Sequence, residues 1–104
     1  MLTLEDCIAL SGLTREEVDA IAEHEHLPET IATELGFYLL QMPHGRQAIN
    51  AMIRDDIEHA RLHADYHHSA KLKLVLRHFI EHCQDALREE AAAAAGGSLH
   101  AAAT

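Results

Sequence analysis

Carboxylate and imidazole side chains recur at helical spacing in the segment 49–63, which holds Asp56, His59 and His63. Side chains three, four and seven residues apart lie on one side of a helix, within reach of a common partner. Isoleucine and alanine residues occupy the same stripe, so Asp56 is a carboxylate in the middle of an apolar face. Burying a carboxylate is costly unless it is paired. The two histidines are its candidate partners, either directly or through a metal ion.

Two further carboxylates, Glu25 and Glu29, lie on the apolar face of the preceding segment if one helix continues through Pro28. The turn at Pro43 would fold that segment antiparallel to the next and bring both acids opposite Asp56. Iron, manganese and zinc accept mixed carboxylate and imidazole ligands, and a carboxylate-rich set favours iron or manganese over zinc. The sequence therefore predicts a metal site, and its predicted ligands are Glu25, Glu29, Asp56, His59 and His63.

These side chains also have a simpler interpretation. They would then form salt bridges with one another or lie solvated at the edge of the apolar stripe. The run Glu23-His-Glu-His26 is typical of a solvated helix end. Glu23 and His26 have ligand spacing as well, but a regular helix directs them to a different side from Glu25.

A Glu on one helix followed by carboxylate-x-x-His on the next resembles the ferritin-like diiron pattern, in which one helical pair supplies half of the site. In this respect the chain is similar to encapsulated ferritin-like proteins, short helical hairpins whose dimer assembles a diiron ferroxidase centre. The resemblance implies Glu29 as the ligand from the first helix and Asp56 with His59 from the second. It also implies iron as the cofactor, a symmetry mate that completes the site, and oxidation of Fe(II) by oxygen or peroxide.

The matching motif is short, and it departs from the family's pattern at two positions. Asp56 stands where the family has Glu, and Pro28 lies beside Glu29 where the family's first helix is uninterrupted. The run Ile57-Glu58-His59-Ala60 stands in the place of the family's Lys-Glu-His-Ala-like run. Near the C-terminus, Gly97-Ser98-Leu99 resembles the core of tails that dock cargo inside encapsulin shells, which implies such a shell as a partner.

The charge of the chain excludes several classes of partner. Among its 104 residues, 17 Asp and Glu outnumber 8 Lys and Arg, and the formal net charge is −9. Phosphate binding needs clustered basic residues, so we expect neither nucleic acid nor an anionic membrane as a partner. We expect no signal peptide and no membrane span, and hence a cytoplasmic protein. Cys7 and Cys83 have no metal-type spacing and are expected to be buried, reduced thiols.

Capping signals and apolar periodicity predict helices throughout, so we expect an all-α fold, a small bundle of four to five helices built on an antiparallel hairpin. Thr3 and Thr14 are N-cap residues, and Glu17 completes a capping box with Thr14. Pro28 either begins a new helix or kinks a continuing one. Later helices are expected at residues 28–41, 46–64 and 70–90, the last capped by Asp65 or Ser69.

The end of the chain differs in composition. Residues 1–90 are predicted to form a single all-α domain, and residues 91–104 an Ala/Gly-rich flexible tail. Gly96 and Gly97 should end the last helix. A domain of this size buries limited surface alone, so we also expect a homo-oligomer.

The competing functional hypothesis is a non-enzymatic interaction or adaptor module. In that case an acidic surface would meet a basic partner. The aliphatic and aromatic side chains would provide packing within and between subunits, namely Leu35, Leu39, Leu40, Leu72, Val75 and Phe79. A pH-responsive assembly is a further alternative, because histidines beside buried acids change charge near neutral pH.

Overall fold

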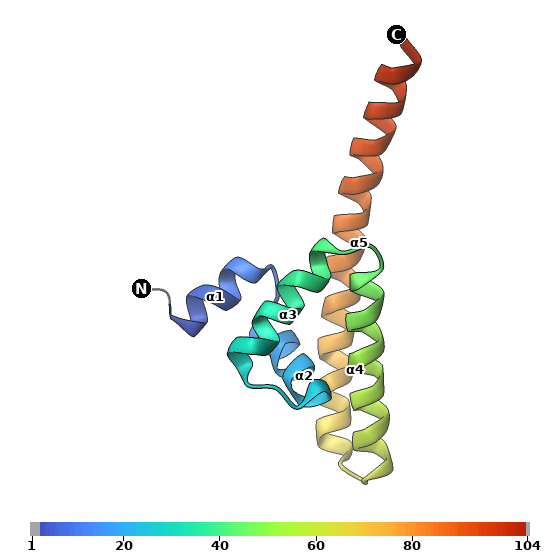
Figure 1. Cartoon of the computed structure of the whole chain (residues 1–104). Coiled ribbons are helices and arrows are strands. Elements are labelled where there is room, and N and C mark those ends of the chain that lie inside the picture. Colours follow the sequence, from blue (N-terminus) through green and yellow to red (C-terminus); the bar gives the residue numbers. More distant parts are fainter. Residues whose placement is uncertain (1–2, 104) are drawn as a thin grey trace.

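The computed structural model describes the backbone of residues 3–103 and the side chains of residues 3–85, 88 and 92. Within this range the chain forms five helices and no strand, which confirms the all-α fold. The helices are α1 (Leu4–Ser11), α2 (Arg15–Glu25), α3 (Glu29–Gln41), α4 (Gly45–Leu62) and α5 (Tyr66–Ala103). Figure 1 shows α4 and α5 as an antiparallel hairpin, with α2 and α3 packed against one side of it and α1 packed against α3.

The first two helices begin where the capping signals predicted. The backbone N–H of Asp6 donates to Oγ1 of Thr3 at 3.1 Å, and the N–H of Glu17 donates to Oγ1 of Thr14 at 3.2 Å. The carboxylate of each acid in turn accepts the backbone N–H of its cap residue, so both helix starts are capping boxes. Gly12 ends α1 with φ of 83°, a left-handed conformation that glycine adopts without strain.

The chain changes direction between α2 and α3 and does not continue as one kinked helix. His26 ends α2 in the left-handed region, with φ of 56°, and Pro28 is the N-cap of α3. Proline suits this position because it has no N–H to leave unpaired at the start of a helix. Glu25 and Glu29 therefore belong to different helices.

The last helix is longer at both ends than predicted. Asp65 is its cap, and its Oδ1 accepts the backbone N–H of His68 at 3.2 Å. The helix then begins at Tyr66 and continues past Gly96 and Gly97, where the sequence predicted its end. A glycine weakens a helix by about 1 kcal/mol relative to alanine and does not block it, and the alanines on either side favour helix. The predicted flexibility of residues 91–104 stays a prediction.

The core lies where α2 and α3 pack against the α4–α5 hairpin. Its larger buried side chains are Ile8, Leu13, Val18, Ile21, Ile49, Ile53, Leu72, Val75 and Phe79. Gly36 is buried in α3, and a Cβ there would overlap Cδ1 of Leu13 and lie 3.1 Å from Cδ1 of Ile21. The absence of a side chain at Gly36 therefore allows the close approach of neighbouring elements.

Two further expectations concern cysteines and membranes. Cys7 and Cys83 are free thiols, half-buried rather than buried, and burial raises the pKa of the Cys83 thiol, which favours the protonated form. In the described part of the chain, no helix combines the length and the apolar character needed to cross a bilayer.

Candidate functional site

A pocket of about 260 Å³ lies between the C-terminal end of α2 and the C-terminal half of α4. Its lining consists entirely of side chains with oxygen or nitrogen donors, namely Glu23, His24, His26, Asp55, Asp56 and His59. No Lys or Arg contributes to it. The pocket is therefore built for a positively charged or hydrogen-bonding occupant.

Asp56 is the buried member of this set, as its place in the helix predicts. The residues in phase with it on α4, Ile49, Ile53 and Ala60, are all buried, and Asp56 itself is 7% exposed. Ile49 and Ile53 belong to the hydrophobic core, so the stripe that carries Asp56 is the buried side of α4. The sequence prediction of a carboxylate within the buried stripe is confirmed.

The electrostatic environment of Asp56 is unfavourable to ionisation. Burial is the main cause that raises its pKa to about 7, and the carboxylates of Glu23 and Asp55 raise the pKa further. The imidazoles of His24 and His68 oppose this shift. The Oδ2 atom of Asp56 is buried and has no hydrogen-bond partner. A carboxylate in this state binds a proton or a cation near neutral pH.

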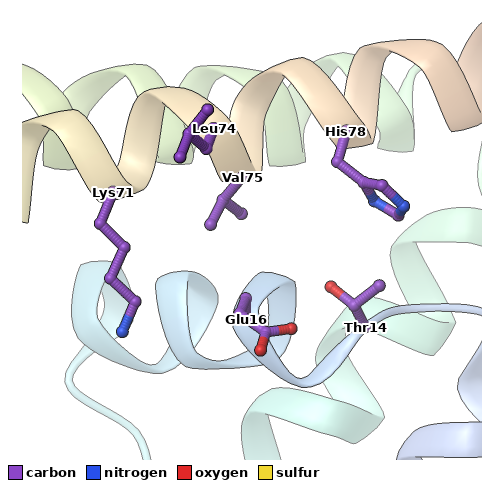
Figure 2. Close-up of a pocket in the computed structure, with 6 residues that line it drawn as sticks. All are labelled: Thr14, Glu16, Lys71, Leu74, Val75 and His78. Carbon is purple, nitrogen blue, oxygen red and sulfur yellow. The ribbon is translucent and has the colours of Figure 1, made fainter.

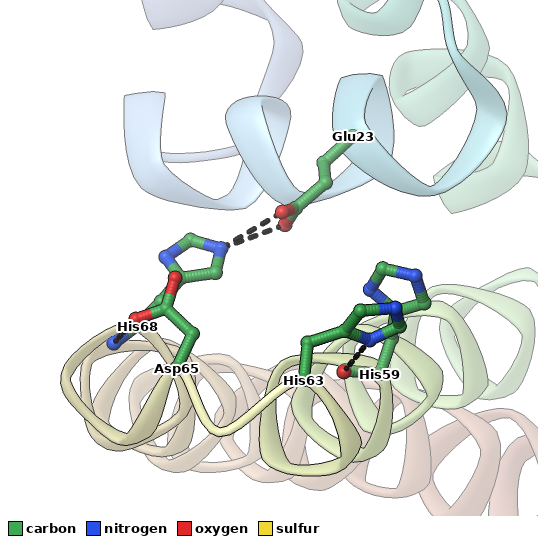
Figure 3. A network of polar contacts seen from close by, with 5 residues as sticks. All are labelled: Glu23, His59, His63, Asp65 and His68. Carbon is green, nitrogen blue, oxygen red and sulfur yellow. Dashed lines mark hydrogen bonds and ion pairs between the residues drawn. The ribbon is translucent and has the colours of Figure 1, made fainter.

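Two imidazole–carboxylate contacts connect the end of α2 to the hairpin around the pocket. His24 Nε2 lies 3.1 Å from Oδ2 of Asp55 on α4, and its buried Nδ1 has no hydrogen-bond partner. That Nδ1 lies 3.7 Å from Oε1 of Glu25. Glu23 reaches across to α5, where its Oε1 lies 2.8 Å from Nε2 of His68 (Figure 3). These contacts hold the pocket's rim in place.

The structure brings only two of the five predicted ligands into this pocket, Asp56 and His59. The ring of His63 lies against that of His59, with centroids 4.2 Å apart, and its Nδ1 is 2.8 Å from the backbone oxygen of His59 (Figure 3). Glu25 lies beside His24 and does not line the pocket. His63 and Glu25 are therefore neighbours of the site.

Glu29 lies elsewhere. Its Oε2 accepts a hydrogen bond from Nη2 of Arg15 at 2.9 Å, in an exposed ion pair between the starts of α2 and α3. The resemblance to a diiron half-site needs Glu29 opposite Asp56, but the Glu29 carboxylate pairs with Arg15 and does not line the pocket of Asp56.

Sequence reasoning missed four side chains of the pocket, Glu23, His24, His26 and Asp55. The signal was present in the run of acids and histidines at residues 23–26, which reads as a solvated helix end. The packing of α2 across α4 turns that end toward Asp56, and periodicity along one helix carries no information about such a crossing.

A second cavity, of about 290 Å³, lies between α2 and α5 (Figure 2). The side chains of Glu16, Lys71 and His78 line it beside Thr14 and two apolar residues. The nearby carboxylate of Glu17 is fully buried, but its Oε1 accepts the backbone N–H of Thr14 at 2.7 Å. Its Oε1 therefore belongs to a helix cap, while its Oε2 is buried without a hydrogen-bond partner and lies 3.7 Å from Nδ1 of His78.

In the conformations observed, no three His, Cys, Asp or Glu side chains of the described residues are placed to hold one metal ion. Comparisons with known proteins found no match among family models, curated proteins or solved structures. Functional inference therefore starts from the pocket around Asp56, and the ferritin-like relationship stays a prediction from the short sequence motif.

Proposed function

We propose that this protein binds a divalent transition-metal ion in the pocket between α2 and α4, with Asp56 as the anchoring ligand. The observation that carries the proposal is the buried Oδ2 atom of Asp56, which has no partner in a pocket without Lys or Arg. A buried carboxylate requires a counter-charge or a proton. A metal ion supplies that charge and uses the surrounding imidazoles as further ligands.

The remaining ligands come from both helices. On α4, His59 follows Asp56 at i+3, a spacing that allows two side chains to reach one ion. On α2, His24 offers an unpartnered Nδ1 atom, and Glu23 or Asp55 would complete the coordination. Iron, manganese and zinc all accept such a set, and the carboxylates favour iron, as the sequence predicted.

Binding requires side chains to change rotamer, because no three donors now converge. His26, Asp55 and His59 are exposed, so their rotamers are not fixed by packing. Ordering such side chains costs about 0.5–1.5 kcal/mol each. Metal coordination contributes about 10 kcal/mol or more in structural zinc sites, so this cost does not prevent binding.

A homo-oligomer fits this proposal, because a site with few protein ligands leaves coordination positions open. A second copy would then supply donors to a neighbouring ion, as the ferritin-like resemblance implies. Oxidation of Fe(II) would require two such half-sites, one from each copy of the protein. Binding of a single ion at Asp56 does not depend on it.

Calorimetric titration of untagged, chelator-treated protein with Zn(II), and with Fe(II) under anaerobic conditions, tests the proposal. We expect saturable binding that Asp56→Asn weakens by about 100-fold or more, since even indirect ligand support is worth about 10–100-fold. Asp85→Asn is the matched control, because Asp85 is an exposed carboxylate on α5 outside the pocket. Binding that is absent in wild type, or unchanged by Asp56→Asn, would refute the proposal.

A further inference from the structure

An apolar groove of about 500 Å³ lies between α1 and α3, on the side of the molecule away from the α4–α5 hairpin (Figure 1). Leu10 and Phe37 line it and are 68% and 48% exposed. Large side chains in contact with water along a concave surface are typical of an interface. Glu34 is the charged residue of the lining.

The charged side chains of the two helices that form the groove are all acidic. These helices carry Glu5, Asp6, Glu29 and Glu34 and contain no Lys, Arg or His. Glu29 has Arg15 as its partner, whereas no Lys or Arg reaches Glu34 among the ion pairs of the described residues. A segment that fits this groove must therefore combine apolar side chains with positive charge.

The chain itself carries such a surface on α5. From Tyr66 to Ile80 this helix contains Lys71, Lys73 and Arg77 and no acidic residue. Leu74, which also lines the edge of the cavity between α2 and α5, is 67% exposed, and Tyr66 is equally exposed two helical turns earlier. The outer face of α5 thus presents two apolar side chains flanked by exposed lysine and arginine.

We infer that the groove between α1 and α3 binds the outer face of α5, around Lys73 and Leu74, of a second copy of this protein. Figure 1 shows α1 on the opposite side of the bundle from α5, so the two surfaces of one molecule cannot meet. Charge complementarity favours this occupant, because the acid-free half of α5 matches the cation-free pair α1 and α3. The interface involves neither Asp56 nor the pocket, and it holds whether or not a metal binds.

Sedimentation velocity over a range of protein concentrations tests this interface. We expect wild-type protein to self-associate, and Leu74→Glu and Glu34→Lys each to weaken association at least tenfold. The double variant Glu34→Lys with Lys73→Glu restores association, because the swapped charges attract again. All these positions are exposed, so the variants should keep the wild-type circular dichroism spectrum.

Glu58→Lys on α4 makes the same change in charge outside both surfaces and should leave association unchanged. A monomeric wild type at every concentration would overturn the inference. So would association that withstands Leu74→Glu, or a double variant that fails to recover. Binding of a basic amphipathic peptide by a strictly monomeric wild type would assign the groove to a foreign partner.

Discussion

Two buried carboxylates, Glu17 on α2 and Asp56 on α4, lie near opposite ends of α2 and have different surroundings. Glu17 lies at the start of α2, fully buried, and its Oε1 accepts the backbone N–H of Thr14 at 2.7 Å. Asp56 faces the other end of the helix, and its buried Oδ2 atom has no partner. Oε2 of Glu17 is likewise buried without a hydrogen-bond partner, but it lies 3.7 Å from Nδ1 of His78, whereas no ion pair of the described residues involves Asp56. Burial alone therefore does not mark a functional acid.

The largest expected difference between the two acids is in pH dependence: Asp56 should make the free energy of unfolding of the protein depend on pH. An unfolded Asp has a pKa of about 3.9, and folding raises the pKa of Asp56 to about 7. Between these values the folded state binds the extra proton, so the free energy of unfolding falls as pH rises, by up to about 1.4 kcal/mol per pH unit. Above about pH 7 this contribution is constant.

Urea unfolding of metal-free protein at several pH values measures this effect against Asp56→Asn, which lacks the titrating group. The variant should become more stable than wild type as pH rises from about 4 to 7. Asp85→Asn should follow wild type throughout. A difference between wild type and Asp56→Asn that does not vary with pH would contradict the account.

The opposite result is expected at the other acid. Glu17→Ala removes one half of a capping box and leaves the N–H of Thr14 without its partner, which should lower the free energy of unfolding by about 1–2 kcal/mol. Metal affinity should stay at the wild-type value. Thermal unfolding and the zinc titration measure the two quantities, with Glu16→Ala, an exposed neighbour, as the control. If Glu17→Ala lost metal binding but kept its stability, Glu17 would be a metal ligand and not a structural acid.

The smallest effect is expected at Glu29. Its ion pair with Arg15 is exposed on both sides, and such pairs contribute between 0 and about 1 kcal/mol. Glu29→Gln should therefore change neither stability nor metal affinity measurably. If Glu29→Gln abolished metal binding, the half-site implied by the ferritin-like motif would be the functional one.

The sequence predicted those features that depend on local signals. Thr14 and Glu17 define the start of α2 because a capping box is complete within four residues. The phase of α4 placed Asp56 on the buried stripe, since a regular helix has only one periodicity. Both results needed no knowledge of the neighbouring helices.

The rest of the site depends on how helices cross, which no local signal encodes. Glu23 and His24 line the pocket with Asp56 because the C-terminal end of α2 packs across α4. The sequence analysis instead predicted Glu25 as a ligand, because it extended the apolar face of α2 along a continuous helix. Glu29 lies outside the pocket, where its carboxylate pairs with Arg15 at the starts of α2 and α3. Tertiary packing decided each of these positions.

The most direct measurement is the metal content of untagged protein by elemental analysis, for wild type and Asp56→Asn purified side by side. A bound divalent metal, about one ion per chain, should be present in wild type and lost in Asp56→Asn, while Glu17→Ala keeps it. Metal affinity should also fall as pH falls below about 7, because protonation of Asp56 competes with coordination. Equal metal content in wild type and Asp56→Asn, or none in either after exposure to iron and zinc, would contradict the account.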